Sequence, residues 1–256
     1  MMVKVAALQC RIGDMKSAYR VAKVAAEHGC EILLFPEYFS YSRLSPEVLD
    51  ETLNFLKKVS AEYGVAVSGN AVVGMEGGYY NRSFIYDSGE LVGWQDKVHP
   101  TRVERQLGVK CGEKLEIFDV RGVKLSVLVC ADILYPELCR VAGLKGAEMV
   151  LNPVVSFKKP DLPGTEYRYC LYFTRAFDNA YAIVKAGGFG RTFTGKDAVG
   201  RSLVATFDGI LAKSCGEYSE EAVIANIDLQ RIRGYKETNY SLTDRNVRAY
   251  LDLLES

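Results

Sequence analysis

Cys130 ends a segment rich in branched residues, Val123–Val129, and stands just before a turn and a helix that begins at Pro136. In α/β proteins, ligand sites gather where strands end beside helix amino termini. A cysteine in this position can act as a nucleophile once its thiol has lost its proton. It can equally be one more small buried hydrophobic residue, as most free cysteines are. This segment alone leaves both interpretations open.

Two charged residues at other predicted strand ends could supply the base and the cation that a cysteine nucleophile needs. Glu37 follows the apolar segment Glu31–Phe35 and a proline, and Lys97 comes just after Leu91–Gln95. A carboxylate can take a thiol proton and later return a proton to a leaving amine. A fixed cation, with the backbone N–H after the nucleophile, can hold the charge that develops on a carbonyl oxygen. By default both side chains are solvated loop residues, and spacing alone does not show that they meet Cys130.

Composition narrows the class of protein that carries these residues. The chain has 256 residues, of which 48% are apolar and 25% charged, as in ordinary soluble domains. Its 32 basic and 32 acidic residues balance, which argues against a nucleic-acid or membrane-surface protein. No apolar run approaches the roughly 20 residues of a membrane span, and the first strand begins without a leader pattern. We therefore expect one soluble domain over residues 1–256.

The cysteines and histidines argue against a metal site or a disulfide framework. Seven cysteines make an odd number and include no C-x-x-C pair, so reduced thiols in a cytoplasmic protein are expected. His28 and His99 do not lie at metal-ligand spacing from a cysteine or from each other. We expect no metal and no organic cofactor.

Strands and helices alternate along the chain, as in α/β proteins. A helix from Asp14 to about His28 and another from Ser45-Pro46 to Gly64 have recognisable caps. Apolar segments bounded by turn residues predict the strands 3–9, 31–35, 65–69, 71–75, 79–86, 91–95, 115–120, 123–129, 149–152, 181–186, 202–207 and 221–227. Further helices are expected over 136–145, over 166–179 and after Asp228, and residues 96–114 are a polar stretch.

An internal similarity indicates two related halves. The segment Val3–Cys10 resembles Val123–Cys130, and each is followed by a helix and a second similar strand, Gly29–Pro36 and Gly146–Pro153. One β-α-β unit is therefore used twice. We expect two sheets packed together with helices outside.

Several motifs in a fixed order resemble the nitrilase, or carbon–nitrogen hydrolase, superfamily. They span nearly the whole chain: Phe35-Pro36-Glu37, Lys97-Val98-His99 with Glu104 downstream, Cys130-Ala131-Asp132 up to Glu137, Asn152-Pro153, Arg175 to Asn179, Gly200 to Ser202, and Asp208-Gly209. The resemblance implies an α-β-β-α sandwich with two pseudo-symmetric halves, a Glu-Lys-Cys triad and a second glutamate. It also implies a homodimer or higher homo-oligomer, with the tail from about residue 239 at an interface.

The resemblance assigns roles residue by residue. Glu37 would be the general base, Lys97 the oxyanion stabiliser, Cys130 the nucleophile and Glu104 the second carboxylate. The Ala131 N–H would complete the oxyanion hole. Asp132 and Glu137 would hold the turn after the nucleophile, and His99 would pack or donate a hydrogen bond. Side chains expected to contact substrate are Tyr38, Tyr41, Asn152, Phe157 and Glu166.

Departures from the family pattern bear on the reaction. Ala131 stands where an aromatic residue is frequent, Asp178 where a longer glutamate is usual, and Phe207 where proline is common. Nitrile-cleaving members resemble Cys-Trp-Glu at the nucleophile, which Cys130-Ala131-Asp132 does not. The sequence therefore predicts a thiol-dependent hydrolase of a small linear amide or carbamoyl compound. The alternatives are acyl transfer or nitrile hydrolysis on the same triad, a silent ligand-binding scaffold, and a redox-sensing thiol protein.

Overall fold

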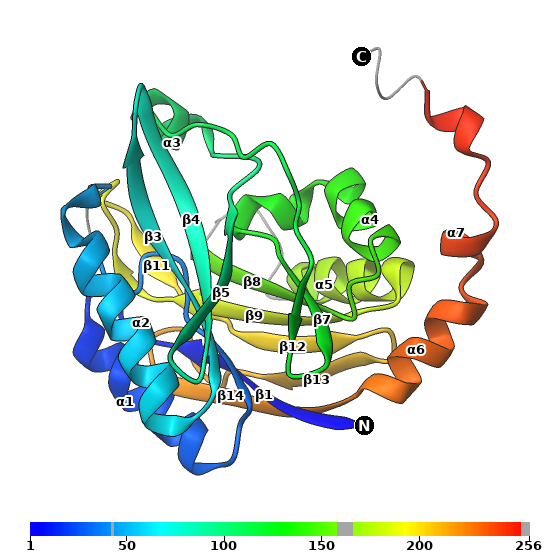
Figure 1. The fold of residues 1–256 in the computed structure, drawn as a ribbon, viewed down its shortest axis with the longest axis horizontal. Helices are drawn as coiled ribbons and strands as arrows, with labels where there is room; N and C mark the ends of the chain where they lie inside the picture. The colour runs from blue at the N-terminus through cyan, green and yellow to red at the C-terminus, as the bar shows by residue number, and fades with distance from the viewer. Residues whose placement is uncertain (42–43, 158–165, 252–256) are drawn as a thin grey trace.

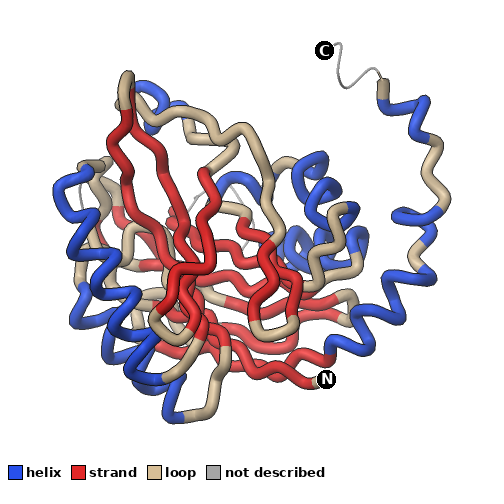
Figure 2. Tube along the Cα trace, viewed as in Figure 1, coloured by secondary structure: helices blue, strands red, loops and turns tan. Residues whose placement is uncertain are grey.

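The computed structural model describes residues 1–41, 44–157 and 166–251. Two β-sheets lie face to face, and helices cover the outer face of each sheet (Figure 1 and Figure 2). This arrangement is the four-layer α-β-β-α sandwich that the sequence predicts. Within the described ranges, no helix is both long and apolar enough to cross a membrane.

The two sheets have the same order and direction of strands. The first sheet runs, in order, β14 (Glu221–Asp228), β1 (Met2–Gln9), β2 (Ile32–Leu34), β3 (Ala66–Met75), β4 (Gly78–Asp87) and β5 (Glu90–Asp96). The second runs β6 (Phe118–Val120), β7 (Val123–Val127), β8 (Met149–Phe157), β9 (Ala182–Gly188), β12 (Leu203–Thr206) and β13 (Gly209–Lys213). In each sheet three parallel strands carry antiparallel neighbours on both sides.

The strand register confirms the internal similarity seen in the sequence. Val5 of β1 pairs with Ile32 of β2, and Leu125 of β7 pairs with Met149 of β8. These are equivalent positions of the two similar segments. The two halves are therefore related by fold as well as by sequence. The second half adds a hairpin, β10 (Gly190–Arg191) and β11 (Asp197–Val199), which pairs with the end of β8.

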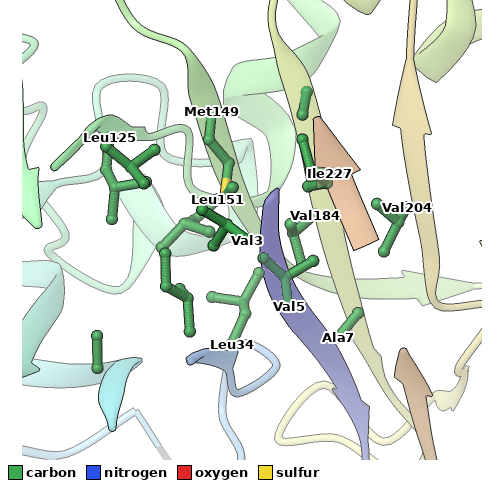
Figure 3. Close-up of a cluster of buried hydrophobic side chains, with 14 of the residues drawn as sticks. Val3, Val5, Ala7, Leu34, Leu125, Met149, Leu151, Val184, Val204 and Ile227 are labelled. Carbon is green, nitrogen blue, oxygen red and sulfur yellow. The ribbon is translucent and has the colours of Figure 1, made fainter. Parts of the chain in front are cut away.

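Side chains alternate along each strand between two faces of the sheet, so the hydrophobic core forms separate layers. Val3, Val5 and Ala7 face the layer between the sheets, which Leu151 and Val184 enter from the other side (Figure 3). Alternate residues of the same strands face outward, to the helices of their own half. Each fully buried leucine or valine contributes about 1.5–3 kcal/mol of transfer free energy. This core fixes the sheet edge on which the site is built.

Helices α1 (Met15–Glu27) and α2 (Leu49–Tyr63) cover the first sheet, and α4 (Pro136–Leu144) and α5 (Glu166–Asn179) cover the second (Figure 1). Asp14 caps α1 as expected, accepting a hydrogen bond from the Ser17 N–H at 3.0 Å. The last elements, α6 (Leu229–Thr238), α7 (Tyr240–Thr243) and η3 (Val247–Tyr250), follow one another along an arm at the edge of the molecule (Figure 1).

Some sequence predictions were wrong in detail. The predicted strands 65–69 and 71–75 are one strand, β3, because buried Asn70 finds a hydrogen-bond partner in Asn81 on β4. The helix predicted from Ser45 begins as a 3-10 turn, η1 (Pro46–Val48), before α2 starts. The polar stretch 96–114 contains a short helix, α3 (Arg102–Gln106). Strand β8 extends past residue 152 to Phe157.

Candidate active site

Three strand ends bring the predicted triad to one edge of the sandwich. Glu37 follows β2, Lys97 follows β5 directly, and Cys130 comes shortly after β7. The Lys97 ammonium lies 2.9 Å from a Glu37 carboxylate oxygen. The Cys130 thiol donates to the Val155 carbonyl oxygen at 3.7 Å, and it lies near enough to Glu37 for each group to shift the other's pKa. Glu37 and Lys97 are each 1% exposed, so neither is the solvated loop residue that it would be by default. The three side chains meet.

Glu104 is the second carboxylate at this cation. The Lys97 ammonium lies 2.8 and 3.0 Å from its two oxygens. The backbone explains this placement, because Glu104 and Thr101 form a capping box at the start of α3. The Thr101 N–H donates to the Glu104 carboxylate at 2.7 Å, which turns that side chain back toward Lys97.

Two neutral side chains complete the polar network. Asn81 donates to Glu37 at 2.8 Å and to Glu104 at 3.0 Å. The Tyr38 hydroxyl donates to Glu104 at 2.6 Å. Asn70 in turn donates to the Asn81 carbonyl oxygen at 3.0 Å, which fixes the orientation of the Asn81 amide. Buried polar groups connected in this way hold a single geometry.

The electrostatics separate the roles of the two carboxylates. Burial raises the pKa of Glu37 and nearby Glu104 adds to this, while Lys97 opposes the rise without cancelling it. Burial would raise the pKa of Glu104 too, but Lys97 and several hydrogen bonds outweigh it and hold that pKa at about 2. Burial alone would lower the pKa of Lys97, yet the acidic groups around it raise that pKa well above its ordinary value. Glu104 is thus a permanent anion, and Glu37 is the better proton acceptor.

Cys130 is held protonated at rest. Burial is the main cause that raises the pKa of its thiol, and the Glu37 carboxylate raises it further. A thiol with a raised pKa stays protonated, so it could attack a carbonyl only with a base beside it. Glu37 and Cys130 both line the same cavity, and each shifts the other's pKa.

The turn at Cys130 has an unusual backbone. Cys130 begins a 3-10 helix, η2 (Cys130–Leu134), with φ at +52°, a left-handed conformation that non-glycine residues rarely adopt. Asp132 holds this turn: its carboxylate accepts hydrogen bonds from the backbone N–H groups of Val129, Val98 and His99. The turn at Cys130 is thereby tied to the segment that follows Lys97.

Asp132 has the structural role expected of it, whereas Glu137 does not. Glu137 is exposed and makes no hydrogen bond or ion pair with any described residue. His99 stacks on Tyr135 with ring centroids 3.6 Å apart and contacts Asp132 at 3.0 Å. It therefore acts in packing and hydrogen bonding, as expected.

A cavity of about 490 Å³ opens onto the network. Glu37, Lys97, Glu104 and Cys130 line it. The other lining residues are Tyr38, Thr101, Val103, Leu107, Val155, Phe157, Thr192, Phe193, Thr194 and Lys196. The volume lies in the range of small-molecule sites.

Of the five residues expected to contact substrate, the structure places only some at the cavity. Tyr38 and Phe157 line the cavity. Tyr41 does not; it is buried behind Tyr38, with ring centroids 5.1 Å apart. Glu166 begins α5, and its side chain lies outside the described residues. Ala131, expected in the oxyanion hole, directly follows Cys130 in η2.

Asn152 does not line the cavity either, and its side chain is fully buried. Its amide N–H groups donate to the backbone carbonyls of Leu128 and Cys130, the latter at 3.3 Å. The Tyr172 hydroxyl donates to the Asn152 side-chain oxygen at 2.7 Å and so fixes which end of the amide faces the turn. Asn152 therefore supports the backbone of the turn at Cys130.

Sequence reasoning missed several residues of the site. Asn81 stands within β4 and has no motif, although a buried asparagine in an otherwise apolar strand is a weak signal. The residues Thr192 to Lys196 belong to the short hairpin β10–β11, which no periodicity revealed. In the described part of the chain, no cluster of three or more histidine, cysteine or acidic side chains is arranged to hold a metal ion.

Comparison with known proteins identifies the family. The sequence profile described as carbon-nitrogen hydrolase matches residues 4–237. The chain belongs to the carbon–nitrogen hydrolase family. A carbon-nitrogen hydrolase from Helicobacter pylori G27 superposes on this hydrolase with a TM-score of 0.87 at 22% identity, over 99% of each chain.

Curated relatives are distant in sequence. A 2-oxoglutaramate amidase of Bacillus subtilis is 27% identical over 88% of each chain, and a nitrilase of Pyrococcus abyssi is 25% identical over 93% of this hydrolase and 92% of its own length. A probable hydrolase of Bacillus subtilis, YhcX, is 26% identical over 89% of this hydrolase, which spans only about half (49%) of that longer relative.

Proposed function

We propose that this hydrolase cleaves the C–N bond of a small linear amide or carbamoyl compound through a thioester on Cys130. The observation that carries the proposal is a single buried ammonium, Lys97, held between two carboxylates beside a thiol at the base of a cavity. One carboxylate is suited to exchange protons and the other to stay ionised.

In the first half of the proposed reaction, the acyl group of the substrate is transferred to Cys130. Glu37 takes the thiol proton as the sulfur attacks the carbonyl carbon, and the C=O electron pair moves to oxygen. The Lys97 ammonium and the Ala131 N–H stabilise that oxyanion. When the intermediate collapses, the C–N bond breaks, and the proton on Glu37 passes to the departing nitrogen. Ammonia or an amine leaves, and a thioester remains.

Deacylation repeats these steps with water. Glu37 takes a proton from a water molecule that attacks the thioester carbon. The C–S bond breaks, the acid is released, and the proton on Glu37 returns to the sulfur. Glu104 stays ionised throughout and holds Lys97 in place.

An amide is favoured over a nitrile because Ala131-Asp132 follows the nucleophile, where nitrile-cleaving members resemble Trp-Glu. One curated relative is named a nitrilase, and others are named amidases. Acyl transfer is the second candidate, since the same thioester can pass its acyl group to an amine.

The test is ammonia release from a panel of short amides, carbamoyl amines and the matching nitriles. Wild type is compared with Cys130→Ala and Glu37→Gln, and both variants should lose about 10³-fold or more in kcat. Cys215→Ala, at an exposed thiol far along the chain, is the matched control and should retain activity. Added hydroxylamine separates hydrolysis from transfer. An inactive wild type across the panel, or an active Cys130→Ala, would contradict the proposal.

A further inference from the structure

The mouth of the cavity is formed by the tip of the hairpin β10–β11. Thr192, Phe193, Thr194 and Lys196 from this tip all line the cavity. The hairpin is joined to the second sheet through β11, where Ala198 pairs with Phe157 of β8. Its tip therefore lies over the catalytic residues because the sheet itself positions it.

Hydrogen bonds hold the shape of this tip. The Lys196 carbonyl accepts from the Thr192 N–H at 3.0 Å and from the Thr192 hydroxyl at 2.8 Å. Gly195, with φ at +74°, closes the turn and donates to the Thr192 carbonyl at 2.9 Å. The Phe193 ring packs edge-on against Tyr38, with centroids 5.2 Å apart. The backbone of Lys196 is thus fixed at the cavity mouth.

The charges of the cavity are separated along its depth. At the base, Glu37 and Glu104 surround one ammonium, Lys97, so the ionised network carries an excess of negative charge. At the mouth stands Lys196, whose ammonium has no ion-pair or hydrogen-bond partner among the described residues. Its neighbour on the hairpin, Arg191, is by contrast paired with Asp197 at 3.7 Å. Among the described residues that line the cavity, the exposed end thus carries a cation and the buried end an excess of carboxylates.

Apolar side chains make up much of the remaining lining. Val103 and Leu107 of the α3 segment, Val155 and Phe157 of β8, and Phe193 of the hairpin contribute this surface. It can accept a hydrocarbon spacer, which needs no polar partner.

We propose that the substrate carries an anionic group, such as a carboxylate, at the end opposite the scissile amide, and that Lys196 binds this group. The inference rests on the proposed function and names its substrate class: the monoamide of a short dicarboxylic acid. With its amide at Cys130, such a molecule places its spacer along the apolar wall and its anion at the mouth. An amide with a cationic tail would meet Lys196 as a like charge. A neutral aliphatic amide would leave Lys196 without a partner.

Three amides of equal chain length test the proposal. Glutaramic acid is the anionic probe, pentanamide has a methyl group in place of the carboxylate, and 4-aminobutanamide has an ammonium there. Wild type should prefer glutaramic acid to pentanamide about tenfold or more in kcat/KM, and rising salt should reduce this preference. Lys196→Gln should reduce the preference about tenfold through KM, and Lys196→Glu should shift it toward 4-aminobutanamide. Arg191→Gln removes a charge from the same hairpin outside the cavity lining, and should keep the wild-type preference.

A second measurement does not depend on turnover. Each amide is used to protect Cys130 from iodoacetamide, in wild type and in Lys196→Gln. Glutaramic acid should protect wild type at about a tenfold lower concentration than pentanamide does, and Lys196→Gln should lose this difference. If protection shows the difference while no amide is hydrolysed, the proposed function fails and the anion site stands. If wild type and Lys196→Gln discriminate equally in both measurements, the anion site is refuted even when amides are cleaved.

Discussion

Replacing Glu104 by glutamine should lower the free energy of unfolding, by an amount that can be worked out from the pKa of Glu104. The pKa of Glu104 is about 2 rather than its ordinary 4.5, because Lys97 and its hydrogen bonds outweigh the effect of burial. Each pKa unit is worth about 1.4 kcal/mol, so the lowered pKa of Glu104 corresponds to about 3 kcal/mol of folding stability at neutral pH. Glu104 is only 2% exposed, so solvent screens little of this energy. Glutamine keeps the size of the side chain but removes the charge.

The pH dependence of this difference has a definite sign. A depressed carboxyl pKa contributes stability that is fully present above the unfolded-state pKa and is lost as pH falls through the folded-state pKa. The difference between wild type and Glu104→Gln should therefore be about 3 kcal/mol at pH 7 and fall to about 2 kcal/mol at pH 3.5. It should continue to fall toward pH 2.

Urea unfolding followed by circular dichroism at pH 7, 4.5 and 3.5 measures this difference. Glu90→Gln, at an exposed glutamate at the start of β5, is the matched control and should change the free energy of unfolding by less than about 0.5 kcal/mol. A Glu104→Gln protein within about 1 kcal/mol of wild type at pH 7 would refute the reasoning. A difference that grows toward acid pH would also refute it.

Three further predictions concern other parts of the molecule. Tyr172→Phe removes the hydrogen bond that orients Asn152 at the turn of Cys130, so steady-state kinetics should show kcat about tenfold lower, with KM changed much less. Gly187→Ala places a Cβ 2.0 Å from the Gly200 carbonyl oxygen, and should lower the free energy of unfolding in urea by about 3 kcal/mol or more. Truncation after Thr238 removes exposed Tyr240, Val247 and Leu251, and light scattering should then give a smaller assembly, because the family resemblance implies an oligomer interface at this tail.

The framework of the site could be predicted because it depends on strand ends. Apolar segments that stop at Phe35 and Val129 identify buried parallel strands, whose carboxyl ends must share an edge of the sandwich. The repeated segment further implied two similar sheets. Strand ends singled out Glu37, Lys97 and Cys130 as candidates, and the ordered motifs that resemble the carbon–nitrogen hydrolases assigned them to one triad. The structure places all three side chains around one cavity.

The supporting residues could not be predicted in the same way. Asn81 reaches Glu37 and Glu104 only because β3 and β4 pair in one register, and register is not visible in either strand alone. Two separate strands were predicted on either side of Asn70, whose side chain in fact finds its hydrogen-bond partner across the sheet. Asn152 was expected at the cavity as the last residue of a strand 149–152, whereas β8 runs on to Phe157 and the Asn152 side chain is buried.

The hairpin that carries Lys196 was missed for another reason. Its strands are two and three residues long, too short for an alternating pattern to stand out. Helix α3 is likewise only five residues long, so its capping box was the only local signal. Short elements gain their stability from the larger sheets beside them, which sequence windows do not include.

The most direct test of the central claim is competition among the thiols for substoichiometric iodoacetamide near pH 6, followed by peptide mapping. Burial raises the pKa of Cys130, so exposed Cys111, Cys170 and Cys215 would react first if thiolate fraction alone decided the outcome. With Glu37 as the base, Cys130 should be labelled ahead of all three in wild type, and should lose this lead in Glu37→Gln. Equal labelling of Cys130 and the exposed cysteines, or a lead that survives in Glu37→Gln, would contradict the proposed triad.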